Sequence, residues 1–315
     1  MANSKNCRTF APVNNEYNMC SNKNLQIAKE VRDDEFYTCE DDIARELTHY
    51  SFNGMIVYCN CDNPDESKFV SYFKDNFEKL GLGLLIATGY NENGKGYYFT
   101  FDGRKSFRSQ LKGNGDCFSD ECVSLLKAAD IIVTNPPFSL FKEYVKLLMD
   151  NSKKFIIIGT ESGITYKDVF PYVMEKKMWV GCNMITKFRL PNGEIKKFGN
   201  ICWYTNVTSN GERMKLPKTN VKYSNEYKYY DNYDAIEVGS VKKVPTDYFG
   251  VMGVPVTYMK YLNPMEYEIV GMSSSSRENA GKYFLGGSTR PILNGKKTFT
   301  RLFIKKIANN LKKVG

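Results

Sequence analysis

The 315-residue sequence contains one histidine, His49, and no long hydrophobic run. Its apolar stretches, such as residues 131–133 and 155–158, are far shorter than the roughly 20 residues that span a bilayer. Residues 1–30 are polar and rich in asparagine, and they lack the apolar stretch of a secretory signal. We therefore expect a soluble, cytoplasmic protein with no membrane partner.

The cysteines also lack a recognisable functional pattern. Nine are present, yet only Cys59 and Cys61 lie within two positions of each other. A structural zinc site or a disulfide framework needs more regular spacing, and a reducing compartment keeps thiols reduced. The sequence thus predicts neither disulfides nor a required metal ion.

Basic residues outnumber acidic residues in the sequence. Lysine and arginine number 44 against 35 aspartates and glutamates, and the net charge of +9 favours a polyanionic partner without proving one. No aspartate or glutamate occurs from residue 290 onward, where the basic residues are Arg290, Lys296, Lys297, Arg301, Lys305, Lys306, Lys312 and Lys313. Such a tract can neutralise phosphates, and Lys296, Lys297 and Arg301 are the candidate nucleic-acid-binding residues. The alternative is a solvated face of a terminal helix or strand.

Residues 33–205 alternate short apolar runs with amphipathic stretches. The runs predict strands at residues 55–58, 84–87, 131–134, 155–159 and 201–205. Apolar positions repeat at helical spacing over residues 66–80, Asp120 and Glu121 open a second helix, and Ser139 is the expected N-cap of a third. Buried strands separated by helices are typical of a doubly wound α/β domain with a mostly parallel sheet covered on both faces.

The two ends of the chain differ from this central part. Residues 1–32 have no hydrophobic periodicity and predict a flexible arm. Residues 206–315 are rich in tyrosine, lysine, glycine and asparagine, and they predict a smaller, irregular domain. In that domain we expect strands at residues 253–258 and 298–304, and loops at residues 273–276 and 281–295.

The most informative motif follows the predicted strand at residues 131–134. It consists of Asn135, Pro136, Pro137 and Phe138. Ligands of open α/β sheets bind at the carboxyl ends of strands, so these residues are expected at the functional edge. The two prolines fix the loop and remove two backbone donors, while their carbonyls remain acceptors.

This loop suits methylation of an exocyclic amino group, which is a poor nucleophile because its lone pair is delocalised into the ring. The Asn135 side-chain oxygen and the Pro136 carbonyl would accept both N–H groups and localise charge on the nitrogen, so that no basic side chain is needed. Phe138 offers a face on which an extruded base can stack. The structural alternative is a capping turn in which Phe138 fills the core.

Several segments together resemble the EcoRI-type adenine-specific DNA methyltransferases, over nearly all of the chain from residue 33 onward. Besides the Asn-Pro-Pro-Phe loop they are residues 34–38 (DEFYT), 57–62 (VYCNCD), 230–236 (YDNYDAI) and 250–255 (GVMGVP). The resemblance implies a class I methyltransferase fold over residues 33–205 and a target-recognition region at residues 206–315. It also implies S-adenosylmethionine as cofactor and methylation of N6 of a flipped adenine in double-stranded DNA. The setting would be restriction-modification or phage or host modification, with a possible cognate restriction endonuclease acting separately.

The resemblance further implies a cofactor site formed by Phe36, Tyr37, Thr38, Asn60, Asp62, Asp116 and Phe118. Residues 36–38 would lie against the methionine end of the cofactor, and residues 60–62 would form the first binding loop. Asp116 would accept a hydrogen bond from the amino group of the adenine ring, and Phe118 would flank that ring; a turn or helix cap is the alternative for Asp116. Residues 59–64 (CNCDNP) depart from the general Gly-x-Gly turn of this loop.

Other substrates can be served by the same kind of loop. Cytosine N4 in DNA, an RNA base and a protein glutamine all present a conjugated amine. A rival of a different class is a non-catalytic DNA-binding protein that keeps the fold. The resemblance over the whole chain favours adenine, and no damage is visible in the Asn-Pro-Pro-Phe loop.

Overall fold

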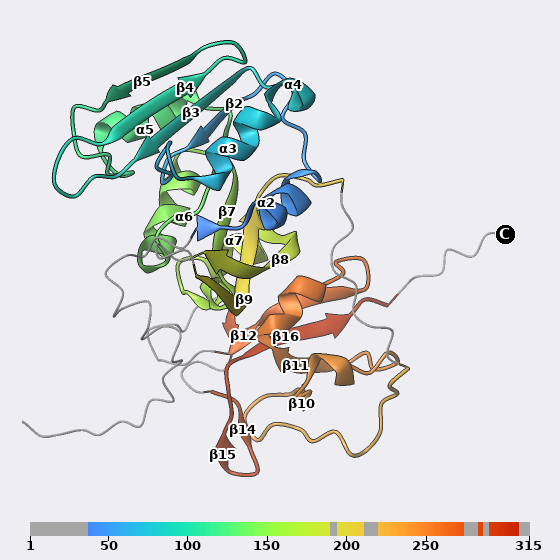
Figure 1. Cartoon of the computed structure of the whole chain (residues 1–315). Coiled ribbons are helices and arrows are strands. Elements are labelled where there is room, and N and C mark those ends of the chain that lie inside the picture. Colours follow the sequence, from blue (N-terminus) through green and yellow to red (C-terminus); the bar gives the residue numbers. More distant parts are fainter. Residues whose placement is uncertain (1–36, 190–193, 211–219, 274–282, 286–289, 309–315) are drawn as a thin grey trace, which may run out of the picture. The chain divides into compact units, whose positions relative to one another are not determined.

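The structure is a computed structural model that describes residues 37–189, 194–210, 220–273, 283–285 and 290–308. Its larger sheet has nine strands in the order β1-β8-β9-β7-β6-β2-β3-β4-β5 (Figure 1). The strands are β1 (Tyr37–Thr38), β2 (Ile56–Cys59), β3 (Leu84–Gly89), β4 (Tyr97–Phe101), β5 (Ser106–Gln110), β6 (Ile131–Thr134), β7 (Lys154–Thr160), β8 (Trp179–Arg189) and β9 (Ile195–Thr205). The predicted arm at residues 1–32 lies outside the described residues.

Four adjacent strands form the parallel centre of this sheet. The pairs β7–β6, β6–β2 and β2–β3 are all parallel. Strand β9 is antiparallel to both β7 and β8, so β8 runs in the same direction as β7. The mostly parallel α/β fold is thus confirmed. The predicted strand at residues 201–205 is part of β9 and runs antiparallel, a direction that apolar composition cannot reveal because a buried strand looks the same either way.

Helices cover both faces of the parallel centre. In β7, Phe155 and Ile157 belong to the hydrophobic cluster that also contains residues of α5 (Asp120–Ala128) and α6 (Phe141–Asp150). On the other face, Trp203 of β9 is fully buried and meets Phe69 of α3 (Lys68–Asp75) edge to face, with ring centroids 5.8 Å apart. Because side chains alternate between the two faces of each strand, the sheet packs against two separate helical layers.

The helix boundaries differ from the predictions in two places. The single stripe over residues 66–80 is divided into α3 and α4 (Phe77–Leu80), because Asn76 leaves helical geometry between them. Helix α5 begins after Ser119, whose side chain accepts the Cys122 N–H. Ser139, by contrast, is not an N-cap: it lies inside the 3-10 turn η1 (Phe138–Leu140), and Leu140 precedes α6.

Five further helical elements lie among the described residues. They are α2 (Glu40–Leu47), α7 (Phe170–Met174) and the 3-10 turns η2 (Glu161–Thr165), η3 (Val241–Lys243) and η4 (Val256–Tyr261). Within the described part of the chain, no helix is long and apolar enough to cross a membrane.

Residues 236–306 form a second sheet of five strands in the order β10-β11-β16-β12-β13. These are β10 (Ile236–Glu237), β11 (Val251–Pro255), β12 (Tyr267–Ser273), β13 (Phe284–Leu285) and β16 (Arg301–Lys306). The predicted strand at residues 253–258 ends at Pro255, directly before η4, and the one predicted at residues 298–304 begins at Arg301.

A separate two-stranded hairpin precedes β16. It pairs β14 (Ile292–Leu293) with β15 (Lys296–Lys297), in a stretch whose first part we expected to be loop. Asn294 and Gly295 have φ angles of 50° and 74°, which makes the turn type I′. An Asn-Gly pair favours this turn because both of its central residues need positive φ.

Candidate active site

The predicted site residues converge because several strands end at the same edge of the large sheet. The parallel strands β2, β3 and β6 have their carboxyl ends together, followed by Asn60, Tyr90 and Asn135. Strand β1 reaches this edge from a distant part of the chain, since Thr38 pairs with Phe188 near the carboxyl end of β8. Phe36 lies outside the described residues, and for Tyr37 only its place in β1 is described.

The Asn-Pro-Pro-Phe loop follows β6 directly. Pro136 is buried, while Asn135 and Phe138 are half-buried. The Pro137 carbonyl accepts the Leu140 N–H at 3.0 Å and closes the turn η1, so the Pro136 carbonyl is the better placed candidate acceptor for a substrate. The loop is therefore fixed by its own backbone.

Phe138 links this loop to β1. Its ring meets Phe188 edge to face, with centroids 6.4 Å apart, and Phe188 is the register partner of Thr38. The contact brings together two motifs that are about 100 residues apart in the sequence. It also gives Phe138 a packing role, which the sequence analysis named as the alternative to base stacking.

Asp62 joins the loop after β2 to strand β6. Its carboxylate accepts hydrogen bonds from the hydroxyls of Ser67, at 2.7 Å, and Thr134, the residue before Asn135. The Thr134 hydroxyl oxygen also accepts the Cys61 N–H at 3.2 Å. Asp62 is only 7% exposed, so its carboxylate sets the position of the loop after β2 relative to the loop after β6.

Asn60 is held from the opposite side by α6. The Tyr144 hydroxyl donates to the Asn60 side-chain oxygen, and both residues are buried. Burial raises the pKa of Tyr144, so the hydroxyl keeps the proton that it donates. Phe118 meets the Tyr144 ring edge to face at 6.4 Å, so Tyr144 connects two predicted cofactor residues.

Asp116 lies on a tightly packed turn beside the end of β3. Gly115 has a φ of 84°, and a Cβ at this position would collide with the Gly89 carbonyl. One Asp116 carboxylate oxygen accepts the Phe118 N–H at 2.9 Å, so the side chain does form a turn, and the residue is exposed. A hydrogen bond with the Cys117 thiol raises the pKa of Cys61 and brings this turn against the first loop.

Sequence reasoning missed the two acidic residues that bind β8, the strand that pairs with β1. Asp42 and Glu46, one turn apart on α2, are almost fully buried. Glu46 accepts the backbone N–H groups of Cys182 and Asn183 in β8, at 2.9 and 2.7 Å, and Asp42 accepts that of Thr186 at 3.3 Å. The missed signal was two carboxylates at i and i+4 directly after the Phe-Tyr-Thr segment, a spacing that places both on one helix face.

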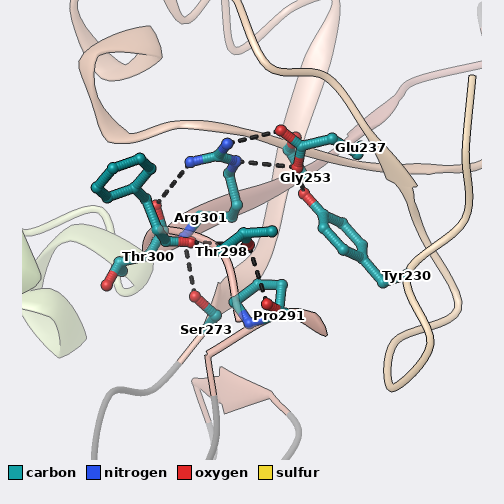
Figure 2. Close-up of polar contacts among 9 residues, drawn as sticks. Tyr230, Glu237, Gly253, Ser273, Pro291, Thr298, Thr300 and Arg301 are labelled. Carbon is teal, nitrogen blue, oxygen red and sulfur yellow. Dashed lines mark hydrogen bonds and ion pairs between the residues drawn. The ribbon is translucent and has the colours of Figure 1, made fainter. Parts of the chain in front are cut away.

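The three candidate nucleic-acid-binding residues fall into two environments. Lys296 and Lys297 are exposed on β15. Arg301 is 8% exposed and forms a bidentate pair with Glu237, which also accepts the Tyr230 hydroxyl (Figure 2). Burial lowers the pKa of Arg301, but the pairing with Glu237 raises it, and the net pKa is above its ordinary value. The guanidinium therefore stays charged and bound to Glu237 inside the sheet. Such an arginine is a poor candidate for a phosphate contact.

Two buried polar atoms at the sheet edge suit a ligand. The Thr38 hydroxyl and the Asn60 side-chain nitrogen make no hydrogen bond to any part of the chain that the structure describes. Buried donors without a partner cost about 1–3 kcal/mol each, which a bound polar molecule would relieve. Both residues belong to the predicted cofactor set, so the residues present fit a polar cofactor at this edge.

The fold and this edge define a class I type methyltransferase, and comparison with known proteins gives the family. The sequence matches the family described as adenine-specific methyltransferase EcoRI over residues 24–108 and 100–308. The chain belongs to this family of adenine-specific methyltransferases. No solved structure matches it significantly.

Three curated relatives are similar over most of their lengths. The chain is 38% identical to the Type II methyltransferase M.EcoRI of Escherichia coli, over 90% of the chain and 97% of that protein. It is 35% identical to M.MgeORF184P of Mycoplasma genitalium, over 89% and 97%. It is 36% identical to M.MpnI of Mycoplasma pneumoniae, over 90% and 98%. Both Mycoplasma proteins are also named Type II methyltransferases.

Proposed function

We propose that the protein transfers a methyl group from S-adenosylmethionine to N6 of an adenine in double-stranded DNA. The observation that carries this proposal is the Asn-Pro-Pro-Phe loop at the carboxyl end of β6, in contact with β8 through Phe138 and tied to the loop after β2 through Thr134. Membership of an adenine-specific family supports the choice of base.

The residues of the loop would act by accepting hydrogen bonds. The Asn135 side-chain oxygen and the Pro136 carbonyl take the two N–H groups of the amine, which raises the electron density on its nitrogen. No side chain needs to remove a proton before the attack, in keeping with a chain that has a single histidine. The rigid turn at Pro137 holds both acceptors before the substrate arrives, and such preorganisation lowers the barrier.

The cofactor would be held by residues from four segments: Phe36, Tyr37, Thr38, Asn60, Asp62, Asp116 and Phe118. S-adenosylmethionine supplies an electrophilic methyl group on a sulfonium centre. Thr38 and Asn60 offer the buried polar atoms that lack a partner among the described residues. Asp62 acts as the positioning residue of this set, because its carboxylate already binds Ser67 and Thr134.

The division of labour along the chain follows from these assignments. Residues 33–205 would form the catalytic domain and residues 206–315 the region that recognises DNA, with Lys296 and Lys297 as phosphate contacts. Since relatives are named Type II methyltransferases, the protein would serve restriction-modification or phage or host modification. A cognate restriction endonuclease, where one exists, would act separately in the same cytoplasm.

The test is the transfer of tritiated methyl groups by the purified protein. We expect label in duplex DNA, recovered after digestion as N6-methyladenine. Label recovered as N4-methylcytosine, in RNA or in protein glutamine would replace the adenine proposal with the corresponding alternative. Absence of transfer to any of these, with intact DNA binding, would favour a non-catalytic DNA-binding protein.

A further inference from the structure

The β14–β15 hairpin combines exposure, positive charge and a defined shape. Residues 294–297 are all exposed. Within the described residues, neither lysine of β15 forms an ion pair, and exposed Arg290 lies just before the hairpin. Phe299, just after it, is 76% exposed. A cationic two-stranded ribbon with an exposed aromatic ring has the chemistry and the size to enter a groove of duplex DNA.

The hairpin is fixed at its base by two adjacent residues of a distant segment, Asp231 and Asn232. The Asp231 N–H donates to the Ile292 carbonyl at 2.8 Å, and the Asp231 carboxylate accepts the Gly295 N–H at 2.7 Å. The Asn232 side chain accepts the Ile292 N–H at 2.7 Å and donates to the Arg290 carbonyl at 3.3 Å. Two adjacent side chains thus bind the strand β14, the turn and the approach to the hairpin.

Packing supports the same geometry. Leu293 of β14 packs against a small cluster formed by Tyr230, Ala235 and Phe303. Thr298 closes the other side of the hairpin with two hydrogen bonds to the Pro291 carbonyl, at 2.7 and 3.0 Å, and Figure 2 shows this contact beside the buried Arg301–Glu237 pair. The Arg301–Glu237–Tyr230 network therefore anchors the strand from which the hairpin extends.

We propose that the β14–β15 hairpin is a groove-contacting element for duplex DNA, and that Asp231 and Asn232 are the residues that position it. Lys296 and Lys297 neutralise phosphates, while Asp231 and Asn232 act through the hairpin without touching DNA. The proposal rests on the proposed function, because it assumes that DNA is the substrate.

The first arm of the test removes the two charges. In Lys296→Ala/Lys297→Ala, the slope of log affinity for DNA against log salt should become shallower by about 2, and affinity near 0.1 M salt should fall tenfold or more. The matched control is Lys79→Ala/Lys127→Ala, which removes two exposed lysines near the amino-terminal edge of the large sheet. We expect the control pair to bind DNA like the wild type.

The second arm separates positioning from stability. Asp231→Ala and Asn232→Ala should weaken DNA binding at least fivefold and leave the cofactor KM unchanged. Asp231→Asn keeps an acceptor for the Gly295 N–H and should restore binding. A melting temperature close to that of the wild type in all three variants would exclude general unfolding as the cause.

The outcomes distinguish this inference from the proposed function. If the wild type fails to methylate DNA, the proposed function itself is wrong. If the wild type methylates DNA but the Lys296→Ala/Lys297→Ala variant matches the control pair, the hairpin does not contact DNA. If Asp231→Ala and Asn232→Ala lower the melting temperature and leave DNA affinity intact, these residues are structural only.

Discussion

Asn135 is the residue on which the proposed chemistry depends most directly. We expect Asn135→Ala to abolish methyl transfer, because the acceptor for one amine N–H is lost, while cofactor binding largely survives since the cofactor residues lie on other strand ends. Asn135→Asp keeps an acceptor oxygen and should retain more activity than the alanine variant. Tritiated methyl transfer and calorimetric titration with cofactor measure the two effects. Transfer by Asn135→Ala at more than about a tenth of the wild-type rate would contradict this assignment.

Asp116 allows a sharper test because its two carboxylate oxygens have different environments. One oxygen accepts the Phe118 N–H, and the exposed side chain leaves the other for a ligand. Asp116→Asn keeps the turn but replaces one acceptor by a donor, so it should weaken cofactor affinity through a lost hydrogen bond of about 1–3 kcal/mol. Asp116→Ala should lose both the turn hydrogen bond from the Phe118 N–H and the hydrogen bond to the cofactor. Calorimetry that gives wild-type affinity for Asp116→Asn and reduced stability for Asp116→Ala would leave Asp116 as a turn residue only.

At the scale of helices and strands, the sequence predicted those elements whose signal lies within a few consecutive residues. The strands β2, β3 and β6 and the start of α5 were predicted because each is a contiguous apolar run or a capped helix. The direction of β9, the strands β4 and β5 and the whole of β8 were missed. Strand β8 interrupts its pairing with β9 by register shifts between Val180 and Met184 and between Ile185 and Lys187, which weakens any alternating pattern.

The same limit applies to the site. The place of the Asn-Pro-Pro-Phe loop at the end of a buried strand was predictable because the apolar run of β6 directly precedes it in the sequence. The roles of Tyr144 and Glu46 were not predictable, because each depends on a partner far along the chain: Asn60 for Tyr144, and Asn183 for Glu46. Their roles require the tertiary structure. The spacing of Asp42 and Glu46 places both on one helix face but does not show which strand they bind, and nothing in the immediate neighbours of Tyr144 distinguishes it from a core residue.

Helix α2 gives a prediction at this scale. The Glu46 carboxylate accepts four hydrogen bonds, from Tyr50, Cys182 and twice from Asn183. Glu46→Ala removes the acceptor of these donors, among them the N–H of buried Cys182, so we expect a loss of about 3 kcal/mol and a melting temperature lower by roughly 5–10 °C. Glu40→Ala, an exposed change on the same helix, should cost less than about 1 kcal/mol. Equal melting temperatures for the two variants would show that Glu46 does not hold β8.

For the molecule as a whole, the positive charge is unevenly used. Arg301 belongs to the basic end of the chain, yet it forms an ion pair with Glu237 inside the second sheet. Lys296 and Lys297, by contrast, lie at the surface. Counting charges therefore overestimates the number of phosphate contacts. What a duplex substrate demands beyond charge is access, because a paired adenine hides its amino group from a loop at the edge of a sheet.

Extrusion of the target adenine is the prediction that involves both the DNA and the Asn-Pro-Pro-Phe loop. The wild type should brighten a 2-aminopurine placed at the target position, and a mismatch opposite the target should tighten binding because the extrusion cost falls. If Phe138 stacks on the extruded base, both Phe138→Ala and Phe138→Leu should lose stacking worth roughly 1–3 kcal/mol and show a smaller fluorescence change.

The two Phe138 variants separate stacking from packing because leucine keeps most of the volume but has no aromatic face. Phe138 already meets Phe188 edge to face, so truncation to alanine must also remove some packing. Truncation of a fully buried phenylalanine to alanine destabilises a protein by about 3–5 kcal/mol, and truncation of half-buried Phe138 should destabilise it less. Stacking predicts that Phe138→Leu melts near the wild-type temperature yet extrudes the base poorly. If Phe138→Leu brightens 2-aminopurine as the wild type does and only Phe138→Ala is impaired, through lowered stability, Phe138 is a packing residue of the β6–β8 contact and another side chain must receive the base.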